Sequence, residues 1–567
     1  MSSFRSRTVT VLRRLSGACL LLLCIAGTTA QAEAVVPRAA AIASAHPLAT
    51  QAGYDILARG GNAFDAAVAV AAALAVVEPY SSGLGGGGFW LLHRAADGFE
   101  TLLDGRETAP GAASAALYQD SAGELIPGAS LNGAKAAGIP GVPAALGHLA
   151  EHYGKLPLRV TLASAIHHAR HGFAVDARYA YMAQLRAEIL RADAPTARIF
   201  LGGDKLPQAG YWLRQPALAA TLETLAQHGR HGFYRGAVAR ELVRSVQAAG
   251  GVWTLQDLKN YQVVERAPVK FSYRGATITA ASLPSSGGVT LAQSLNILER
   301  MQWDTETDKA HLVVEAMRRA YHDRARYLGD PDFVAAPVEQ LASKDYAAER
   351  AASIKLQQAT PSAALAATDA VQQGDNTTHY SIVDAAGNRV AATLSINIPF
   401  GAARVAGNTG VLLNDEMDDF AMSAGVANIY GLVHGSANLI QPGKRPLSSM
   451  TPTFVEDAKG LLILGTPGGS RIISMVLLTI LDYLESPAPN LRALVSAPRY
   501  HHQYLPDHLE IEPDAFSAEW IKALEQRGHT LKTANRQWGN MQAVWVDKAS
   551  GRSVAASDPR GEDFGGY

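Results

Sequence analysis

"GDNTTHYS", residues 374–381, places Thr377 directly after Asn376 at the head of a strand-like run. If the peptide bond between these two residues is cut, Thr377 acquires a free α-amine beside its own hydroxyl. A terminal α-amine titrates near ~8 and can accept the hydroxyl proton, whereas the hydroxyl of an internal threonine is too weakly acidic to attack an amide at neutral pH. Cleavage would therefore be the activating step. On local sequence alone, a turn leading into a β-strand is the simpler interpretation.

The composition describes a globular protein with a large core. The chain has 567 residues, of which 48% are hydrophobic and 18% charged, and no Pro/Ser-rich linker or charge block divides it. Its formal net charge of −1 gives no indication of nucleic-acid binding.

Residues 1–32 are typical of a secretory signal peptide. Four arginines precede an apolar run over residues 18–26, and Ala30-Gln31-Ala32 fits a small-x-small cleavage site. The run is shorter than the ~20 residues that span a bilayer, which disfavours the alternative of a retained membrane anchor. Both cysteines, Cys19 and Cys24, lie in this segment, so the mature chain would contain none and would carry a formal charge of −5. We expect a periplasmic or secreted bacterial protein without disulfides and without a stable membrane span.

The first two thirds of the chain read mainly as helices. A helical pattern over residues 48–77 is broken at 60–62, and the glycine run 83–88 leads into the apolar run 89–92. No Gly-Lys-Ser/Thr follows that glycine run, so close backbone packing beside a core strand is a better interpretation than a phosphate loop. Residues 139–355 favour helices, for example over 143–153, 216–227 and 309–328. Residues 352–373 are rich in Ala, Gln, Ser and Thr, which predicts a mobile tail before Thr377.

After Thr377 the pattern changes to strands. We expect strands over 379–383, 390–396, 410–413, 452–456, 461–465 and 542–546, and helices over 472–484 and 518–527. Helices that flank β-hairpins indicate an α+β fold with layers in the order helix, sheet, sheet, helix.

A set of motifs resembles the γ-glutamyltransferases of the N-terminal-nucleophile hydrolase superfamily. Besides "NTTHYS", they are "GNAFDAAVAVAAALAVVEP" (61–79), "LGGGGFW" (84–90), "GRETAP" (105–110), "LLNDEMDDF" (412–420), "KRPLSSMTPT" (444–453), "GTPGGSRII" (465–473), "APRYHHQ" (497–503) and "SDPR" (557–560). They follow in family order over roughly residues 49–560. Each motif is weak alone, but the combination is highly specific.

The resemblance implies a four-layer αββα sandwich formed jointly by two autoproteolytic fragments. Thr377 would be the nucleophile, and the precursor would cut itself between Asn376 and Thr377 into a large subunit (33–376) and a small subunit (377–567), which stay together as one intertwined heterodimeric domain. Ser395, where relatives often carry Thr, would orient Thr377 and contact substrate. The backbone N–H groups of Gly468 and Gly469 would form the oxyanion hole. A tight turn before the helix at Ile472 is the alternative interpretation of the glycine pair.

By the same resemblance, other residues bind the two charged ends of an α-amino acid. Arg106, Ser448 and Ser449 would hold the α-carboxylate, and Gly469 would also contact substrate. The α-ammonium would lie against Asn397, Glu416 and Asp419. Tyr430 would belong to a lid over residues 420–444, which excludes water. Without the resemblance, Arg106 reads as a loop arginine, "NDEMDDF" as a solvated acidic turn and Tyr430 as static packing.

No metal or other cofactor is expected. His167, His168 and His171 cluster on a helical stretch, but no Glu accompanies them as in a zinc-protease helix.

The resemblance implies ping-pong acyl transfer. The γ-glutamyl group of glutathione or a related γ-glutamyl compound would form an ester on Thr377, which water, an amino acid or a dipeptide then resolves. One alternative keeps the fold but changes the acyl group, as in cephalosporin or glutaryl acylases and poly-γ-glutamate processing enzymes. Another is a secreted binding protein that never cleaves itself and remains a single chain.

Overall fold

A computed structural model of the chain describes residues 35–203, 205–365, 377–423 and 427–561. The predicted signal peptide and the residues from 366 to Asn376 lie outside this part. The residues from Val35 onward form one compact unit. Within the described ranges, no helix is both long and apolar enough to cross a bilayer.

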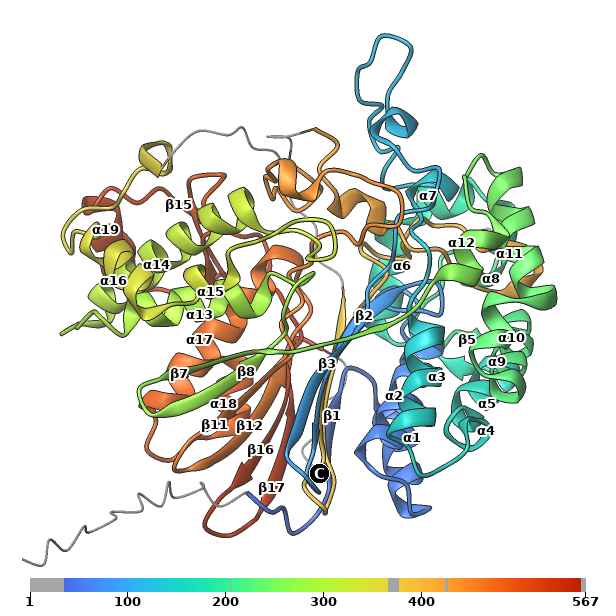
Figure 1. Cartoon of the computed structure of the whole chain (residues 1–567), viewed down its shortest axis with the longest axis horizontal. Coiled ribbons are helices and arrows are strands. Elements are labelled where there is room, and N and C mark those ends of the chain that lie inside the picture. Colours follow the sequence, from blue (N-terminus) through green and yellow to red (C-terminus); the bar gives the residue numbers. More distant parts are fainter. Residues whose placement is uncertain (1–34, 204, 366–376, 424–426, 562–567) are drawn as a thin grey trace, which may run out of the picture. The chain divides into compact units, whose positions relative to one another are not determined.

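Two six-stranded β-sheets, each built from strands that are far apart in the sequence, form the centre of the fold (Figure 1). The first has the order β1-β9-β10-β2-β3-β6 and the second the order β17-β16-β12-β11-β8-β7. The strands of the first sheet are β1 (Ala41–Ser44), β2 (Gly87–Arg94), β3 (Phe99–Gly105), β6 (Val264–Arg266), β9 (Thr378–Val383) and β10 (Arg389–Ser395). Those of the second are β7 (Val269–Tyr273), β8 (Ala276–Ala280), β11 (Thr453–Glu456), β12 (Gly460–Gly465), β16 (Gln542–Asp547) and β17 (Ser553–Ser557). Segments on both sides of Thr377 therefore contribute to both sheets.

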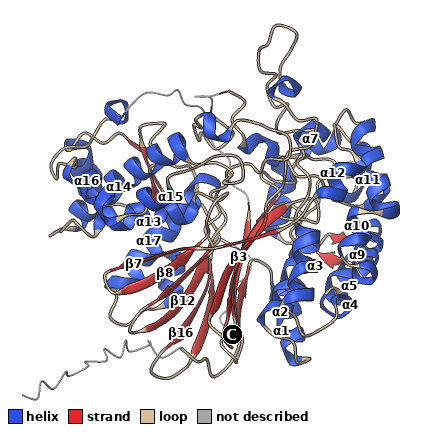
Figure 2. Ribbon diagram, in the orientation of Figure 1, coloured by secondary structure: helices blue, strands red, loops and turns tan. Residues whose placement is uncertain are grey.

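Helices cover the outer face of each sheet (Figure 2). The helices associated with the first sheet are α1 (Pro47–Ala58), α2 (Ala63–Val77), α3 (Val142–His152), α4 (Leu158–Thr161), α5 (Ala163–His171), α6 (Ala177–Leu185), α7 (Ala187–Arg191), α8 (Ala194–Phe200), α9 (Pro216–His228), α10 (Arg230–Tyr234), α11 (Gly236–Ala248) and α12 (Leu255–Asn260). Those associated with the second are α13 (Gly287–Leu298), α14 (Glu306–Tyr327), α15 (Val338–Leu341), α16 (Lys344–Ala352), α17 (Ile472–Glu485), α18 (Leu491–Ser496) and α19 (Ala518–Gln526). Two small sheets, β13 (Tyr500–His501) with β14 (Leu509–Ile511) and β15 (Leu531–Thr533), and β4 (Phe173–Ala174) with β5 (Trp212–Leu213), complete the elements.

Side chains that alternate between the two faces of each strand explain this layering. In β10, Val390, Ala392 and Leu394 pack on the helical side, whereas Ala391 faces the second sheet. Because side chains alternate along a strand, Ser395 shares the face of Ala391, and Thr377 likewise shares the face of Ser381 in β9. Ser381 Oγ donates to the carbonyl of Gln542 in the second sheet at 3.1 Å. The nucleophile predicted from sequence therefore lies on the side of its sheet that faces the other sheet.

Local sequence explains the central helix α2. It is buried along its whole length and begins with a capping box, in which Asn62 Oδ1 accepts the N–H of Asp65 at 3.0 Å and the Asp65 carboxylate accepts the N–H of Asn62 at 2.9 Å. The helix ends at Val77, just before Glu78-Pro79, as the restriction on residues before proline predicts.

Most predicted elements lie within one or two residues of their observed bounds, but three predictions differ from the structure. Residues 410–413 form only an isolated bridge between Val405 and Leu412 instead of a strand. Residues 139–355 contain the hairpin of β7 and β8 in addition to helices. The described part of the predicted mobile tail is anchored, because Ser362 N–H donates to Asp507 at 2.7 Å and Thr360 N–H to Glu315 at 3.1 Å.

The glycine run 83–88 packs closely against other backbone, as predicted. A Cβ on Gly86 would overlap the carbonyl oxygen of Ser395, and one on Gly85 would overlap that of Leu412. A Cβ on Gly83, by contrast, would lie 3.8 Å from its nearest neighbours, which is ordinary contact.

We expect Gly86→Ala to destabilise the protein by at least about 2 kcal/mol, because backbone atoms of β10 cannot yield to the added methyl group. Gly83→Ala is the matched control within the same run and should be nearly neutral. Thermal unfolding of the purified variants measures the difference. Equal melting temperatures for the two variants would show that this backbone contact is not tight.

Candidate active site

Thr377 immediately precedes β9, at the end of the sheet where β10 finishes. The two strands pair antiparallel with Thr378 opposite Leu394, which brings Thr377 beside Ser395. Thr377 Oγ1 donates to Ser395 Oγ at 3.4 Å, a long hydrogen bond, and Ser395 Oγ also accepts the N–H of Asn397 at 2.7 Å. Thr377 is only 4% exposed. The chain therefore presents a buried hydroxyl whose orientation depends on a second hydroxyl.

The second sheet brings a glycine turn to the same place. β12 ends at Gly465, where a Cβ would overlap the ring of His379, two residues after Thr377. The following turn contains Gly468 and Gly469, which have φ values of 143° and 56°. Both values lie in the region that glycine adopts most readily. Helix α17 begins three residues later, at Ile472, so the predicted turn before this helix is also present.

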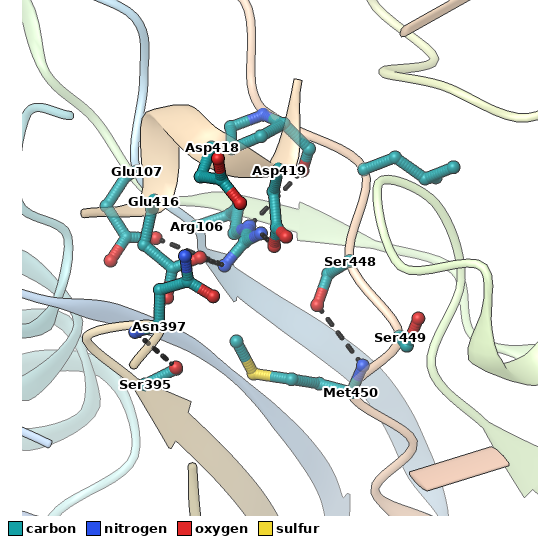
Figure 3. A network of polar contacts seen from close by, with 12 residues as sticks. Arg106, Glu107, Ser395, Asn397, Glu416, Asp418, Asp419, Ser448, Ser449 and Met450 are labelled. Atoms are coloured by element: carbon teal, nitrogen blue, oxygen red, sulfur yellow. Dashed lines mark hydrogen bonds and ion pairs between the residues drawn. The ribbon is translucent and has the colours of Figure 1, made fainter. Parts of the chain in front are cut away.

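Arg106 is the centre of a buried ionic cluster (Figure 3). It follows β3, and its Nη1 lies 2.5 Å from Glu416 Oε2, while its Nη2 donates to Asp419. Arg106 Nε donates to the carbonyl of Pro446 at 3.2 Å. Glu107 Oε2 lies 3.5 Å from Nη1. The residues predicted to bind opposite ends of an amino acid thus pair with each other.

Three carboxyl groups around one guanidinium cannot all be charged at low cost. Burial, and then the charge of Glu416, raises the pKa of Glu107 well above its usual range. Burial also raises the pKa of Glu416 to about 7, although the charge of Arg106 opposes this shift. Burial alone would lower the pKa of Arg106, but Glu416, Asp419 and Glu107 together raise it. Arg106 therefore stays charged, while Glu107 keeps its proton to a higher pH than an exposed glutamate does.

Two further loops, which contain Ser448 with Ser449 and Tyr430, lie next to the ionic cluster. Ser448 Oγ accepts the N–H of Met450 at 3.1 Å, and Ser449 Oγ accepts from Arg324 Nη2 at 3.1 Å. The hydroxyl of Tyr430 donates to the carbonyl of Asn397 at 2.8 Å.

These residues line a single small cavity of about 20 Å³, enough space for about one water molecule. Of the predicted site residues, its wall contains Arg106, Thr377, Ser395, Asn397, Glu416, Asp419, Tyr430, Ser448, Ser449 and Gly469. Gly468 directly precedes the wall residue Gly469, and Asn376 lies outside the described residues. A ligand of amino-acid size must therefore displace the ion pairs of Arg106 or move the segment of Tyr430.

The candidate active site does not lie in a second, larger cavity. A cavity of about 630 Å³ lies among α3, α4 and α10 and is lined by His148, His152 and Arg230, but none of the predicted site residues borders it. In the part of the chain that the structure describes, no cluster of three or more His, Cys, Asp or Glu side chains could hold a metal ion.

The comparison with known proteins agrees with the motifs. A family model described as Gamma-glutamyltranspeptidase matches residues 49–566. The chain belongs to the γ-glutamyltranspeptidase family. It is 43% identical over 534 residues to a glutathione hydrolase proenzyme from Pseudomonas sp. (strain A14), with 92% of each chain covered. It is 41% identical over 529 residues to the glutathione hydrolase proenzyme of Escherichia coli (strain K12), with 92% of this chain and 90% of that protein covered.

Solved structures confirm the predicted fold. A crystal structure of cephalosporin acylase from Bacillus halodurans matches with a TM-score of 0.81 and 29% identity, and covers 93% of this chain and 96% of that one. The chain is therefore an enzyme of the γ-glutamyltranspeptidase family with the αββα fold of N-terminal-nucleophile hydrolases, as the motifs predicted. The role of each site residue remains a prediction.

Sequence reasoning missed Arg324, which also lines this γ-glutamyltranspeptidase cavity. It lies on α14 among Arg318, Arg319 and Arg326, where the sequence pattern is that of an ordinary charged helix. Nothing in the local sequence separates Arg324 from the exposed Arg326.

The ionic cluster predicts a pH effect on stability. Because the folded-state pKa of Glu107 is raised, the folded protein holds a proton that the unfolded chain loses above about pH 4.5. This residue should therefore make folding less favourable by about 1 kcal/mol per pH unit above that value, until its folded pKa is reached. Glu107→Gln has no such proton to lose, so its stability relative to the wild type should rise as the pH increases above about 5.

Melting temperatures of both proteins across this pH range test the effect, and the exposed Glu339→Gln serves as a control whose pH profile should match the wild type. A constant difference between Glu107→Gln and the wild type would mean that Glu107 is ionised in the folded protein.

Proposed function

We propose that the protein cleaves the γ-glutamyl amide bond of glutathione and related γ-glutamyl compounds and transfers the acyl group to water, amino acids or peptides. One observation carries this proposal: Thr377 shares a buried cavity with a guanidinium and two carboxylates that are matched to the charges of an α-amino acid. Family membership and the names of the relatives, which are glutathione hydrolase proenzymes, support the same activity.

Substrate binding exchanges one set of ion pairs for another. The α-carboxylate takes a place on Arg106 with Ser448 and Ser449, and the α-ammonium takes the carboxylates of Glu416 and Asp419 that Arg106 releases. Each buried charge keeps a partner throughout, so the exchange avoids the cost of an unpaired ion. This places the γ-carbonyl toward Thr377.

The chemistry then follows from the position of Thr377. Once the bond to Asn376 is cut, the α-amine of Thr377 accepts the hydroxyl proton while Oγ1 attacks the γ-carbonyl carbon. The N–H groups of Gly468 and Gly469 stabilise the oxyanion, and one such donor is worth about 3 kcal/mol. The amine leaving group takes the proton as the C–N bond breaks, and a γ-glutamyl ester remains on Thr377. Water or an acceptor amine, deprotonated by the same α-amine, resolves the ester.

The mature enzyme would consist of residues 33–376 and 377–567. Both segments supply strands to both sheets, which supports a heterodimer that stays assembled after cleavage. The residues over 1–32 support export and a periplasmic or secreted location. Tyr430, with the segment 420–444, would cover the acyl-enzyme and limit access of water.

Thr377→Ala should abolish both self-cleavage and turnover, with a loss of at least about 1000-fold in kcat/KM, because neither the hydroxyl nor the new α-amine beside it is present. Thr378→Ala, which changes the neighbouring hydroxyl, should still be cut. Denaturing gels show whether the chain of 59.9 kDa is cleaved, and N-terminal sequencing identifies the new end. A small fragment that begins anywhere other than Thr377 in active material, or normal processing of Thr377→Ala, would contradict the mechanism.

The choice of acyl group is a separate prediction, since one structural relative is a cephalosporin acylase. A glutaryl group has the carboxylate but no ammonium, so its binding would leave Glu416 or Asp419 without a cation. We expect the γ-glutamyl anilide to be cleaved at least about 10-fold more efficiently than the glutaryl anilide. Faster turnover of the glutaryl anilide would instead identify an acylase.

A further inference from the structure

Arg324 is a buried guanidinium without a carboxylate partner. Its side chain comes from α14 and is 1% exposed. Nε donates to Ser286 Oγ at 2.9 Å and Nη2 to Ser449 Oγ at 3.1 Å. Among the described residues, no group accepts a hydrogen bond from Nη1. A buried charged donor in this state costs the protein stability, so its retention at a cavity wall points to a ligand.

The other arginines nearby are paired. Arg106 contacts both Glu416 and Asp419, and Arg319, on the same helix as Arg324, lies 2.6 Å from Glu315. Within the described ranges, no carboxylate forms an ion pair with Arg324. Burial lowers the pKa of Arg324 to about 10, which still leaves the group charged at neutral pH.

The groups around Arg324 do not cancel this charge. Asp419 acts on it electrostatically but is already bound to Arg106 and accepts from Asn428 Nδ2 at 2.9 Å. His434 is buried, and burial, followed by the charge of Arg324, holds its pKa well below the usual range. This histidine is therefore neutral. On the side of the cavity formed by Arg324 and Ser449, no carboxylate among the described residues is hydrogen-bonded to the guanidinium.

Arg324 also controls the direction of the Ser449 hydroxyl. A serine hydroxyl has one proton to donate and can accept at its lone pairs. Because Arg324 Nη2 donates to Ser449 Oγ, the proton of this hydroxyl must point elsewhere. Ser448 Oγ likewise accepts the N–H of Met450. Both serines line the cavity on a loop separate from Ser395 and Asn397 (Figure 3). Their hydroxyl protons therefore remain available for donation to an anion.

We propose that Arg324 is a second cationic anchor for the α-carboxylate of the substrate, which it binds through Nη1 while it orients Ser449 toward the same group. This inference rests on the proposed γ-glutamyl activity and adds a residue to its binding site. A carboxylate held by Arg324, Ser449 and Arg106 gives the unsatisfied Nη1 its partner. The carboxylate can bind there without removing any hydrogen bond that Arg324 already makes.

The test compares two substrates on the processed enzyme: the γ-glutamyl anilide and its α-carboxamide analogue, which keeps the ammonium and the shape but lacks the negative charge. Arg324→Met should lower kcat/KM for the γ-glutamyl anilide by about 10- to 100-fold, mostly through KM, and change that for the carboxamide less than about threefold. Arg324→Lys keeps a positive charge but cannot bind Ser449 and the carboxylate at the same time through a planar guanidinium. Its decrease in kcat/KM for the γ-glutamyl anilide should therefore be intermediate. Arg326→Met, an exposed change on the same helix, is the matched control and should behave like the wild type.

The outcomes are distinct. If both substrates lose the same factor in Arg324→Met, or neither loses any, Arg324 is a structural brace and the inference is wrong. If Arg324→Met does not fold or process, the same comparison in Arg324→Lys decides. If the wild type does not cleave the γ-glutamyl anilide, the proposed function fails before Arg324 is tested.

Discussion

The close contact between His379 of β9 and Gly465 of β12 joins the two sheets at the end where the site lies. His379 is fully buried, and its Nδ1 forms a hydrogen bond of 2.8 Å with Thr393 Oγ1. The ring is neutral because burial lowers the pKa of His379 to about 3. Since any side chain at position 465 would overlap its ring, the glycine is what allows the approach. Thr377 and the turn with Gly468 and Gly469 are each a few residues from this contact. The geometry of nucleophile and oxyanion donors thus depends on how the two sheets pack.

The ionic cluster shows why such a site is stable without ligand. Arg106 is fully buried, and its guanidinium pairs with Glu416 and Asp419 rather than with solvent. Buried ion pairs seldom add much net stability, because desolvation offsets the attraction. In this site, the ion pairs matter because a charged ligand can take the place of one partner in each pair. A zwitterionic α-amino acid replaces each internal partner with one of the same charge, whereas an uncharged or singly charged group cannot.

The sequence predicted the fold from local signals, and the family motifs predicted site residues, most of which the structure brings together around one cavity. The motif around Thr377, the apolar α2 and the hairpin of β9 and β10 each carry their information within a few residues, and family motifs added the positions of Arg106, Ser448 and Ser449. What failed depended on distant contacts. Residues 410–413 have a strand-like composition, yet among the described residues they form only the single bridge between Leu412 and Val405. Residues 352–365 look mobile in composition, yet Glu315 and Asp507 hold their backbone. Arg324 has the local sequence of a solvated helix, and only tertiary packing distinguishes it.

In a buried cavity lined by charged groups, substrate selectivity comes mainly from the free-energy cost of leaving a buried charge unpaired, rather than from additional contacts with the correct substrate. The wall of the cavity holds charged groups of both signs, and most of its side chains are buried. Inside such a site, a correct substrate mostly replaces contacts that the protein already makes with itself, so its net gain is modest. A substrate that lacks one charge leaves a buried ion without a partner, and that costs more than any hydrogen bond it forms elsewhere. Discrimination between substrates therefore grows with the burial of the ionic cluster.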